Sequence, residues 1–206
     1  MFGSALFWFA LALVFAAVEV EIEGRHGWAE KLPTWYRTTG FWARLYGFVL
    51  RGKPLTGYHL FMFFLPLLAL HSAFFLGAPF TLAGEFRLLA IYAFWVSLWD
   101  YLWFVLNPDY GARGFRKNRV WWYARSHWIF GLFPLEYALS VALSLKLALA
   151  AAYFAGDWGI FTGHLALLGL MAPLLALAIL VLGPRYRRWH TRMRERDDRD
   201  RAGIFH

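Results

Sequence analysis

The sequence predicts an all-α integral membrane protein: a bundle of five transmembrane helices with the N-terminus outside and the C-terminus in the cytoplasm. Three observations lead to this prediction. Hydrophobic residues make up 60% of the 206 residues and aromatic residues 21%, whereas soluble domains are roughly 45–50% apolar. Five runs are long and apolar enough to span a bilayer, which takes about 20 residues. Basic residues alternate between rich and poor connecting segments.

The five apolar runs define the predicted spans. The first is interpreted as a retained helix and not a signal peptide, because it lacks the positively charged start of a signal peptide. The runs cover approximately residues 2–20, 57–76, 88–106, 129–154 and 160–182.

The distribution of Lys and Arg predicts the orientation. Six follow the first run, five follow the third, and eight lie in the C-terminal tail. The segment after the second run has only Arg87, and the turn after the fourth has none. Basic residues favour the cytoplasmic side of a membrane. Strict alternation therefore requires five spans with the tail inside.

The chain is expected to form one membrane-embedded domain, residues 1–184, followed by a solvated tail of mixed charge, residues 185–206. The segment between the first two spans is long for a helix connection. Within it, apolar residues recur at helical spacing, with Arg44 and Arg51 among them: Phe41, Trp42, Leu45, Phe48 and Val49. This pattern predicts a short amphipathic helix in the lipid headgroup layer.

Three carboxylates are the leading candidates for catalytic residues, since ionisable groups inside a membrane are costly and usually functional. Asp100 and Glu136 each lie about seven residues from the cytoplasmic end of a span, which places them roughly 10 Å deep. Glu19 lies near the cytoplasmic end of the first span. No Lys or Arg of the other spans lies at that depth, so only a metal, a histidine or a loop arginine could keep Asp100 charged.

Histidines predicted at the same membrane face extend this set into a candidate metal site. His59 opens the second span, His127 precedes the fourth, and His26 follows the first. If the first helix continues past Gly24, then Glu19, Glu23 and His26 share one face. The candidate ligands are Glu23, His26, His59, Asp100, His127 and Glu136. Oxygen and imidazole donors together suit iron, manganese or zinc.

Other readings of these residues remain open. The carboxylates could act without metal as general acids, or could hold helices together by pairing with Arg or Trp donors. His71 and His164 lie near the outer ends of their spans, and two histidines at matched depth could ligate a haem. Only one such pair exists, so haem is not expected. Trp95, Trp99 and Trp103 lie along the same predicted helix as Asp100. Some of them could line a cavity, and aromatic walls suit an isoprenoid-like lipid.

Composition excludes several classes of protein. The chain has no cysteine, which rules out disulfides, iron–sulfur clusters and cysteine nucleophiles. The net charge of +8 is explained by membrane topology and anionic headgroups, so nucleic acid is not expected as a partner. The sequence contains no nucleophile elbow of the Gly-x-Ser-x-Gly type and no phosphate-binding loop.

The sequence thus predicts a small enzyme of a bacterial or archaeal cytoplasmic membrane, acting on a lipid or isoprenoid-like substrate. Its carboxylate and histidine site is expected in the cytoplasmic half of the bundle, with membrane lipid and a lipid-like small molecule as partners. One alternative is a non-enzymatic accessory or assembly subunit of a membrane complex. The other is an ion- or proton-coupled transporter, although five helices allow no inverted repeat within one chain.

Overall fold

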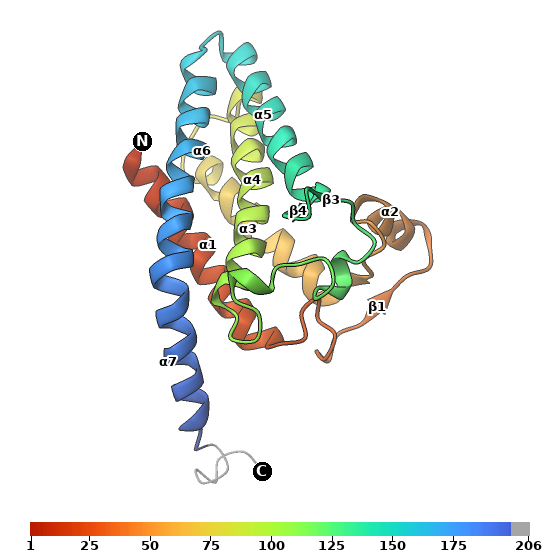
Figure 1. The fold of residues 1–206 in the computed structure, drawn as a ribbon. Helices are drawn as coiled ribbons and strands as arrows, with labels where there is room; N and C mark the ends of the chain where they lie inside the picture. The colour runs from red at the N-terminus through yellow and green to blue at the C-terminus, as the bar shows by residue number, and fades with distance from the viewer. Residues whose placement is uncertain (199–206) are drawn as a thin grey trace.

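The computed structural model describes residues 1–198 and is built mainly from α-helices (Figure 1). Five helical segments are long and apolar enough to cross a membrane, which confirms the predicted all-α fold and the number of candidate spans. The orientation in the membrane stays a prediction. The five segments are α1 (Phe2–Glu23), α3 (Gly57–Phe75), α4 (Leu82–Leu106), α5 (Leu135–Ala155) and the continuous stretch Gly159–Glu195.

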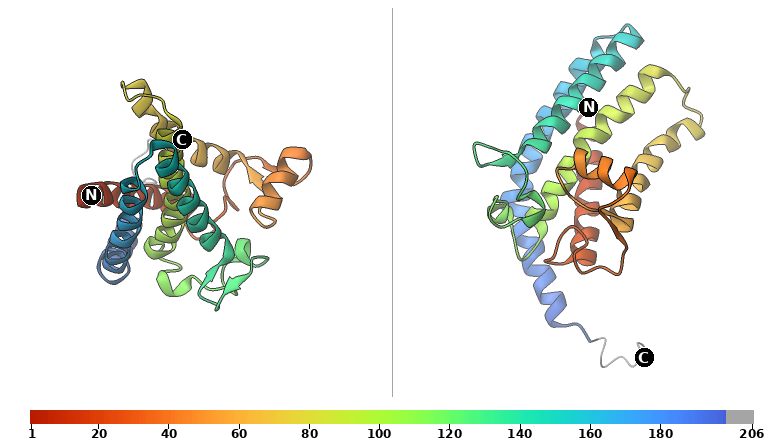
Figure 2. Two further views of the ribbon diagram at one scale, coloured as in Figure 1. Left: turned by 90° about the horizontal axis from the view of Figure 1, so that it is seen from above. Right: turned by 90° about the vertical axis from the view of Figure 1, so that its right-hand side faces the viewer.

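Helix α4 is central and packs against α1, α3 and α5 (Figure 2, left). The buried faces of α1 and α5 carry many small side chains, which allow helix backbones to approach closely. On α5, the buried Ser144 donates a hydrogen bond to the Ala90 carbonyl of α4 at 2.7 Å. The fully buried small residues of α1 and α5 include Ala5, Ala12, Ala16, Ser144, Ala151 and Ala152.

The last span consists of α6 (Gly159–Leu177), a π-helical turn (Ala178–Leu182) and α7 (Gly183–Glu195). Gly183 allows this helix to pass close to the end of α4, since a Cβ there would lie 2.8 Å from the Val105 carbonyl oxygen. Arg187 donates a hydrogen bond to the same carbonyl. The helix therefore extends into the predicted tail as far as Glu195, and residues 199–206 of that tail lie outside the described residues.

Two long connections lie at the end of the bundle from which α7 emerges (Figure 1). The first holds β1 (Tyr36–Arg37), α2 (Phe41–Val49) and β2 (Leu55–Thr56), with β1 and β2 antiparallel. The second holds the 3₁₀ turns η1 (Ala112–Gly114) and η2 (Trp121–Tyr123) and the hairpin of β3 (Trp128–Ile129) and β4 (Phe133–Pro134). Helix α2 covers the segment predicted to be an amphipathic helix, and its place in the headgroup layer stays a prediction.

Three boundaries differ from the sequence prediction. Helix α1 continues to Glu23 and ends where Gly24 takes a φ of +59°. Helix α4 begins at Leu82 and not near residue 88, because the Thr81 side chain caps it by accepting from the Gly84 N–H at 3.0 Å. The fourth span begins at Leu135 and not near residue 129, because the β3–β4 hairpin occupies the preceding residues.

Candidate functional site

A cavity of about 170 Å³ lies where α1, α3, α4 and α5 meet the two long connections. Glu19, His59, Asp100 and Glu136, which the sequence predicts at one end of the bundle, all line it. Except for one lysine, the other lining residues are aromatic, aliphatic or serine: Trp28, Leu50, Lys53, Phe63, Val96, Ser97, Trp99, Tyr123, Tyr137 and Ser140. The cavity therefore combines ionisable groups with aromatic walls.

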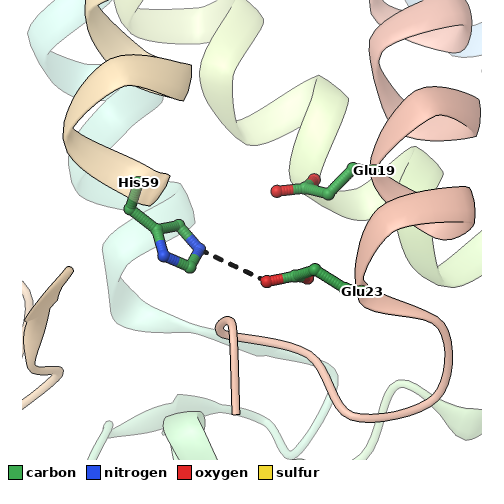
Figure 3. Close-up of side chains that lie close together, drawn as sticks. All are labelled: Glu19, Glu23 and His59. Carbon is green, nitrogen blue, oxygen red and sulfur yellow. Dashed lines mark ion pairs between the residues drawn. The ribbon is translucent and has the colours of Figure 1, made fainter. Parts of the chain in front are cut away.

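Two carboxylates from α1 and one imidazole from α3 lie close together at this cavity (Figure 3). Glu19 and Glu23 are one helical turn apart, so their side chains share a face. His59 lies in the first turn of α3, with its Nε2 3.7 Å from Glu23 Oε1. One ligand atom from each residue lies within 4.8 Å of the others, and all three residues are buried. This cluster could hold a metal ion.

The environment of His59 suits a ligand role. Thr56, the N-cap of α3, accepts a hydrogen bond from the His59 backbone N–H at 3.1 Å, and its Oγ1 lies 2.9 Å from ring atom Nδ1. The Trp28 ring stacks on the imidazole with 4.0 Å between centroids. If Nδ1 donates its proton to Thr56, the Nε2 lone pair is free to face the glutamates, as in many metal-bound histidines.

An unusual turn after α1 brings groups onto Glu23 and His59. Gly27, Trp28 and Ala29 follow one another with φ values of 45°, 47° and 55°. Positive φ is strained for residues other than glycine and often marks a functional site. Here the turn stacks Trp28 on His59 and lets the Ala29 N–H donate to Glu23 Oε1 at 2.5 Å. The strained backbone thus orients two members of the cluster.

Asp100 of α4 accepts hydrogen bonds from two tyrosines. The Tyr123 hydroxyl donates to Asp100 Oδ2 at 2.9 Å, and the Tyr137 hydroxyl donates to the same oxygen. Tyr123 belongs to the second connection, outside the spans. Burial and the neighbouring Asp100 carboxylate raise the pKa of the Tyr123 hydroxyl well above its ordinary value. Tyr123 therefore keeps its proton and serves as a donor at neutral pH.

Lys53 supplies a positive charge to the cavity from the first connection. Only 5% of the residue is exposed, and its Nζ lies 3.6 Å from the centre of the Tyr123 ring and 4.4 Å from that of Trp28. Burial lowers the pKa of Lys53 to about 8, against the opposing effect of the Asp100 and Glu136 carboxylates. The ammonium form therefore predominates at pH 7. The cation near Asp100 is thus a loop lysine, whereas the sequence indicates a metal, a histidine or a loop arginine for this role.

Several polar atoms at the cavity have unused hydrogen-bonding capacity. Ser126 donates to Glu136 Oε1 at 2.5 Å, whereas Oε2 of the same carboxylate is buried without a hydrogen-bond partner among the described residues. Within the same part of the chain, the Tyr58 hydroxyl and the Trp99 indole N–H lie close to the Glu19 carboxylate but complete no hydrogen bond of ordinary geometry. Because unpaired buried polar groups are unfavourable, these atoms are available to a bound ligand.

The site contains more carboxyl groups than basic groups. Glu19, Asp100 and Glu136 line the cavity and Glu23 adjoins it, whereas Lys53 is the one Lys or Arg among its described lining residues. Four ionised carboxylates facing one ammonium would repel one another strongly at low dielectric. Either some of the carboxyl groups are protonated, or a further cation is bound. The Glu19, Glu23 and His59 donors are of a kind that could hold a divalent metal.

Two of the histidines predicted as metal ligands lie outside the cluster. His26 follows the end of α1, so the proposed helical face with Glu19 and Glu23 does not extend to it. Its Nδ1 instead lies 3.8 Å from the exposed Glu30 carboxylate. His127 is exposed at the start of the β3–β4 hairpin. Asp100 and Glu136 line the cavity but are not members of the three-residue metal cluster.

Sequence reasoning missed Lys53, Tyr123 and Tyr137 as parts of the site. The sequence places Lys53 among the basic residues that set the topology, because nothing in its loop position indicates that it turns inward. Tyr123 lies in a connection rich in Arg and Trp, a composition that predicts a segment at the membrane interface. Tyr137, next to Glu136 at the start of a span, was the one with a visible signal, since a polar aromatic group there needs a hydrogen-bond partner.

The tryptophans and the remaining histidines have separate places. Trp99 lines the cavity, whereas Trp103 packs in the apolar core. His71 Nε2 lies 3.1 Å from Glu85 Oε1, and His164 Nε2 lies 2.8 Å from the Ser144 hydroxyl. His71 and His164 therefore form hydrogen-bond contacts with different side chains.

The fold and site together define a membrane-type helical bundle with a buried carboxylate and histidine cluster. No known protein family, curated protein or solved structure matches the chain. The assignment of function therefore depends on the geometry of the site.

Proposed function

We propose that this protein is a membrane enzyme that binds a divalent metal at Glu19, Glu23 and His59 and acts on a lipid or isoprenoid-like substrate. The observation that carries the proposal is the buried cluster itself, with three ligand atoms within 4.8 Å of one another beside a cavity. Burial of two carboxylates in a membrane bundle is costly, and a metal ion compensates their charge.

The donor set limits the choice of metal. Two carboxylate oxygens and one imidazole nitrogen suit zinc, manganese or iron. Three protein ligands leave coordination positions for water or substrate, which is typical of catalytic and not structural metal sites. Such a metal would act as a Lewis acid or lower the pKa of bound water.

Asp100 and its two tyrosines are proposed as the acid–base group of the enzyme. Tyr123 and Tyr137 hold one oxygen of the Asp100 carboxylate through their hydroxyls. Lys53 provides a positive charge over the face of the Tyr123 ring. A carboxyl group held this way in an aromatic cavity can transfer a proton at a fixed position. Glu136, with one free oxygen, is a second candidate.

The size of the cavity supports a lipid-like substrate of which only the reacting end enters. A volume of about 170 Å³ is too small for a whole lipid, since pockets for drug-sized ligands measure ~300–1,000 Å³. An apolar groove of about 670 Å³ runs along α3, lined by Phe61, Met62, Leu65 and Tyr58. Tyr58 is also a neighbour of Glu19. The apolar part of a substrate could lie in this groove with its polar end directed at the cluster.

Metal analysis of the purified protein tests the proposal. We expect one equivalent of zinc, manganese or iron per chain, and loss of this metal in Glu23→Gln and His59→Ala. His127→Ala is the matched control, because His127 is exposed and outside the cluster, and it should retain the metal. Wild-type protein that takes up none of these metals when each is supplied, while remaining folded, would refute the metal site.

A non-enzymatic subunit is the second candidate, supported by apolar side chains exposed outside the spans. Phe48 on α2 is 83% exposed, and Phe130 at the tip of the β3–β4 hairpin is 93% exposed. Exposed apolar groups of this kind mark membrane or protein contacts. Phe48→Ser together with Phe130→Ser would then abolish assembly with a partner and leave metal content unchanged. If the doubly substituted protein stays in its native complex, this alternative fails.

A further inference from the structure

A second and larger groove lies at the other end of the bundle, away from the candidate metal cluster. It measures about 900 Å³ and is formed by α1, α3, α4 and α6. Helices α1 and α3 diverge here on either side of α4 (Figure 2, left). Its walls are mainly apolar and include Leu11, Pro66, Leu88 and Leu167. The groove therefore has the chemistry of an acyl-chain site.

Aromatic side chains separate this groove from the cavity at the metal cluster. Phe15 and Trp95 line the groove, and their rings are 5.1 Å apart in an edge-to-face arrangement. The Trp95 indole N–H donates to the Trp8 carbonyl at 3.0 Å and ties α4 to α1. Trp99, which lines the other cavity, lies beyond Trp95 at 5.6 Å between centroids. The groove is thus a distinct site.

One end of the groove carries an arginine that has no ion-pair partner. Arg87 of α4 lines the groove and makes no salt bridge or side-chain hydrogen bond within residues 1–198. The two nearest acidic groups make their contacts elsewhere, and neither forms a salt bridge with Arg87 within residues 1–198. Glu85 faces His71 at 3.1 Å, and Asp157, which also lines the groove, accepts from the Gly159 N–H at 2.8 Å. The guanidinium is therefore free for an anion.

A buried histidine adds polar character beside this arginine. Ser144 donates its hydroxyl proton to the Ala90 carbonyl at 2.7 Å. Its oxygen therefore accepts from His164 Nε2–H at 2.8 Å, which leaves His164 Nδ1 without the proton. His164 lines the groove and lies within electrostatic range of Arg87. The polar groups of the groove are thus gathered near one end, and apolar walls make up the rest.

We propose that this groove binds an anionic phospholipid, with its phosphate at Arg87 and an acyl chain along the apolar walls between α1 and α3. The planar guanidinium suits bidentate contact with phosphate. Arg87 lies near the start of α4, so its long side chain can reach the headgroup layer. This lipid site is independent of the proposed enzymatic function, since it shares no lining residue with the other cavity.

Two glycines of α6 provide a matched test of the groove. A Cβ at Gly163 or at Gly169 would meet no atom within 4 Å, and only Gly163 lines the groove. Gly163→Leu should place its side chain in the groove, and Gly169→Leu should leave the groove open. Proteins are reconstituted into nanodiscs of equal phosphatidylglycerol and phosphatidylcholine, extracted into mild detergent and examined by native mass spectrometry. We expect one retained phosphatidylglycerol in the wild type and in Gly169→Leu, and none in Gly163→Leu.

Charge variants test the headgroup contact. Arg87→Gln should reduce the preference for phosphatidylglycerol over phosphatidylcholine about tenfold, in keeping with the loss of one charge-assisted contact. Lys146→Gln, which removes an exposed charge of α5 outside the groove, should keep it, and Arg87→Lys should keep part of it. Equal retention of the two lipids by the wild type, unchanged selectivity in Arg87→Gln, or lipid retained by Gly163→Leu would each overturn the proposal.

Discussion

The Lys53 ammonium lies 3.6 Å from the centre of the Tyr123 ring, and the hydroxyl of the same tyrosine donates to Asp100. Lys53 and Tyr123 come from the two long connections, so this contact joins both to a carboxylate of the central helix. A cation over an aromatic face is stabilised by the ring quadrupole, more strongly when desolvated. The connections are therefore part of the candidate site.

Thr56→Val is expected to lower the affinity for the metal about 10–100-fold, because the Thr56 hydroxyl orients His59 from outside the ligand set. The same substitution removes the N-cap of α3, which costs about 1 kcal/mol of stability. Thr56→Ser keeps both hydrogen bonds and serves as the control. Metal affinity is measured by competition with a chelator. Equal affinities in the valine and serine variants would exclude this role for Thr56.

Asp100→Asn is expected to leave the metal bound, because Asp100 is not in the three-residue cluster, and to lower turnover about 10²–10⁴-fold by removing the acid–base group. Turnover is followed by mass spectrometry of extracted membrane lipids incubated with purified protein. Tyr137→Phe, which removes one donor to Asp100, should have a smaller effect. A fully active Asp100→Asn protein would leave Glu136 as the remaining carboxylate candidate.

Stability should depend on the titration of Lys53. Burial lowers its pKa in the folded protein to about 8 from an ordinary value of 10.5. Between these values the unfolded chain binds the proton that the folded chain has released. Stability therefore rises with pH from about 8 to about 10.5, by up to ~3 kcal/mol.

The corresponding test compares wild type with Lys53→Met in thermal unfolding experiments in detergent from pH 7 to pH 10. The wild-type unfolding temperature should contain a rising component above pH 8 that the methionine variant lacks. Arg51→Met, a substitution at an exposed basic residue of the same connection, should retain it. Identical pH profiles for all three proteins would contradict a buried Lys53 ammonium.

Gly27→Ala should destabilise the protein more than Gly24→Ala. Both glycines have positive φ, which costs an alanine about 1 kcal/mol. A Cβ at Gly27 would also lie 2.2 Å from the Trp122 ring, whereas one at Gly24 would meet no atom within 4 Å. Unfolding temperatures in detergent provide the measurement. Equal temperatures for the two variants would show that Trp122 does not pack on this turn.

The predicted orientation is tested with reporter fusions in the connecting segments. Alternation of Lys and Arg predicts that fusions at residues 82 and 157 report the outside, and that those at 115 and 200 report the cytoplasm. This places the candidate metal cluster toward the cytoplasmic face and Arg87 toward the outer leaflet. A cytoplasmic signal at residue 157 would remove the last span from this topology.

The sequence alone determined the class of fold, because the length of an apolar run follows directly from bilayer thickness. It also selected Glu19, Asp100, Glu136 and His59, since a charge in a membrane span is conspicuous whatever its neighbours are. Helix ends were less certain. The sequence does not show that Gly24 stops α1, and this decides that Glu23 joins the cluster and His26 does not.

Only the tertiary structure decided which groups complete the site. Lys53 and Tyr123 lie in polar connections where composition predicts exposure, and they turn inward because the two connections fold over the end of the bundle. Thr56 and Trp28 gain their roles from contacts with His59. The sequence places Arg87 in a connecting segment, whereas in the structure α4 begins at Leu82 and Arg87 lines an open groove. The length of an apolar run depends on the lipid bilayer and can be recognised from consecutive residues. Contacts between distant segments depend on how the helices pack.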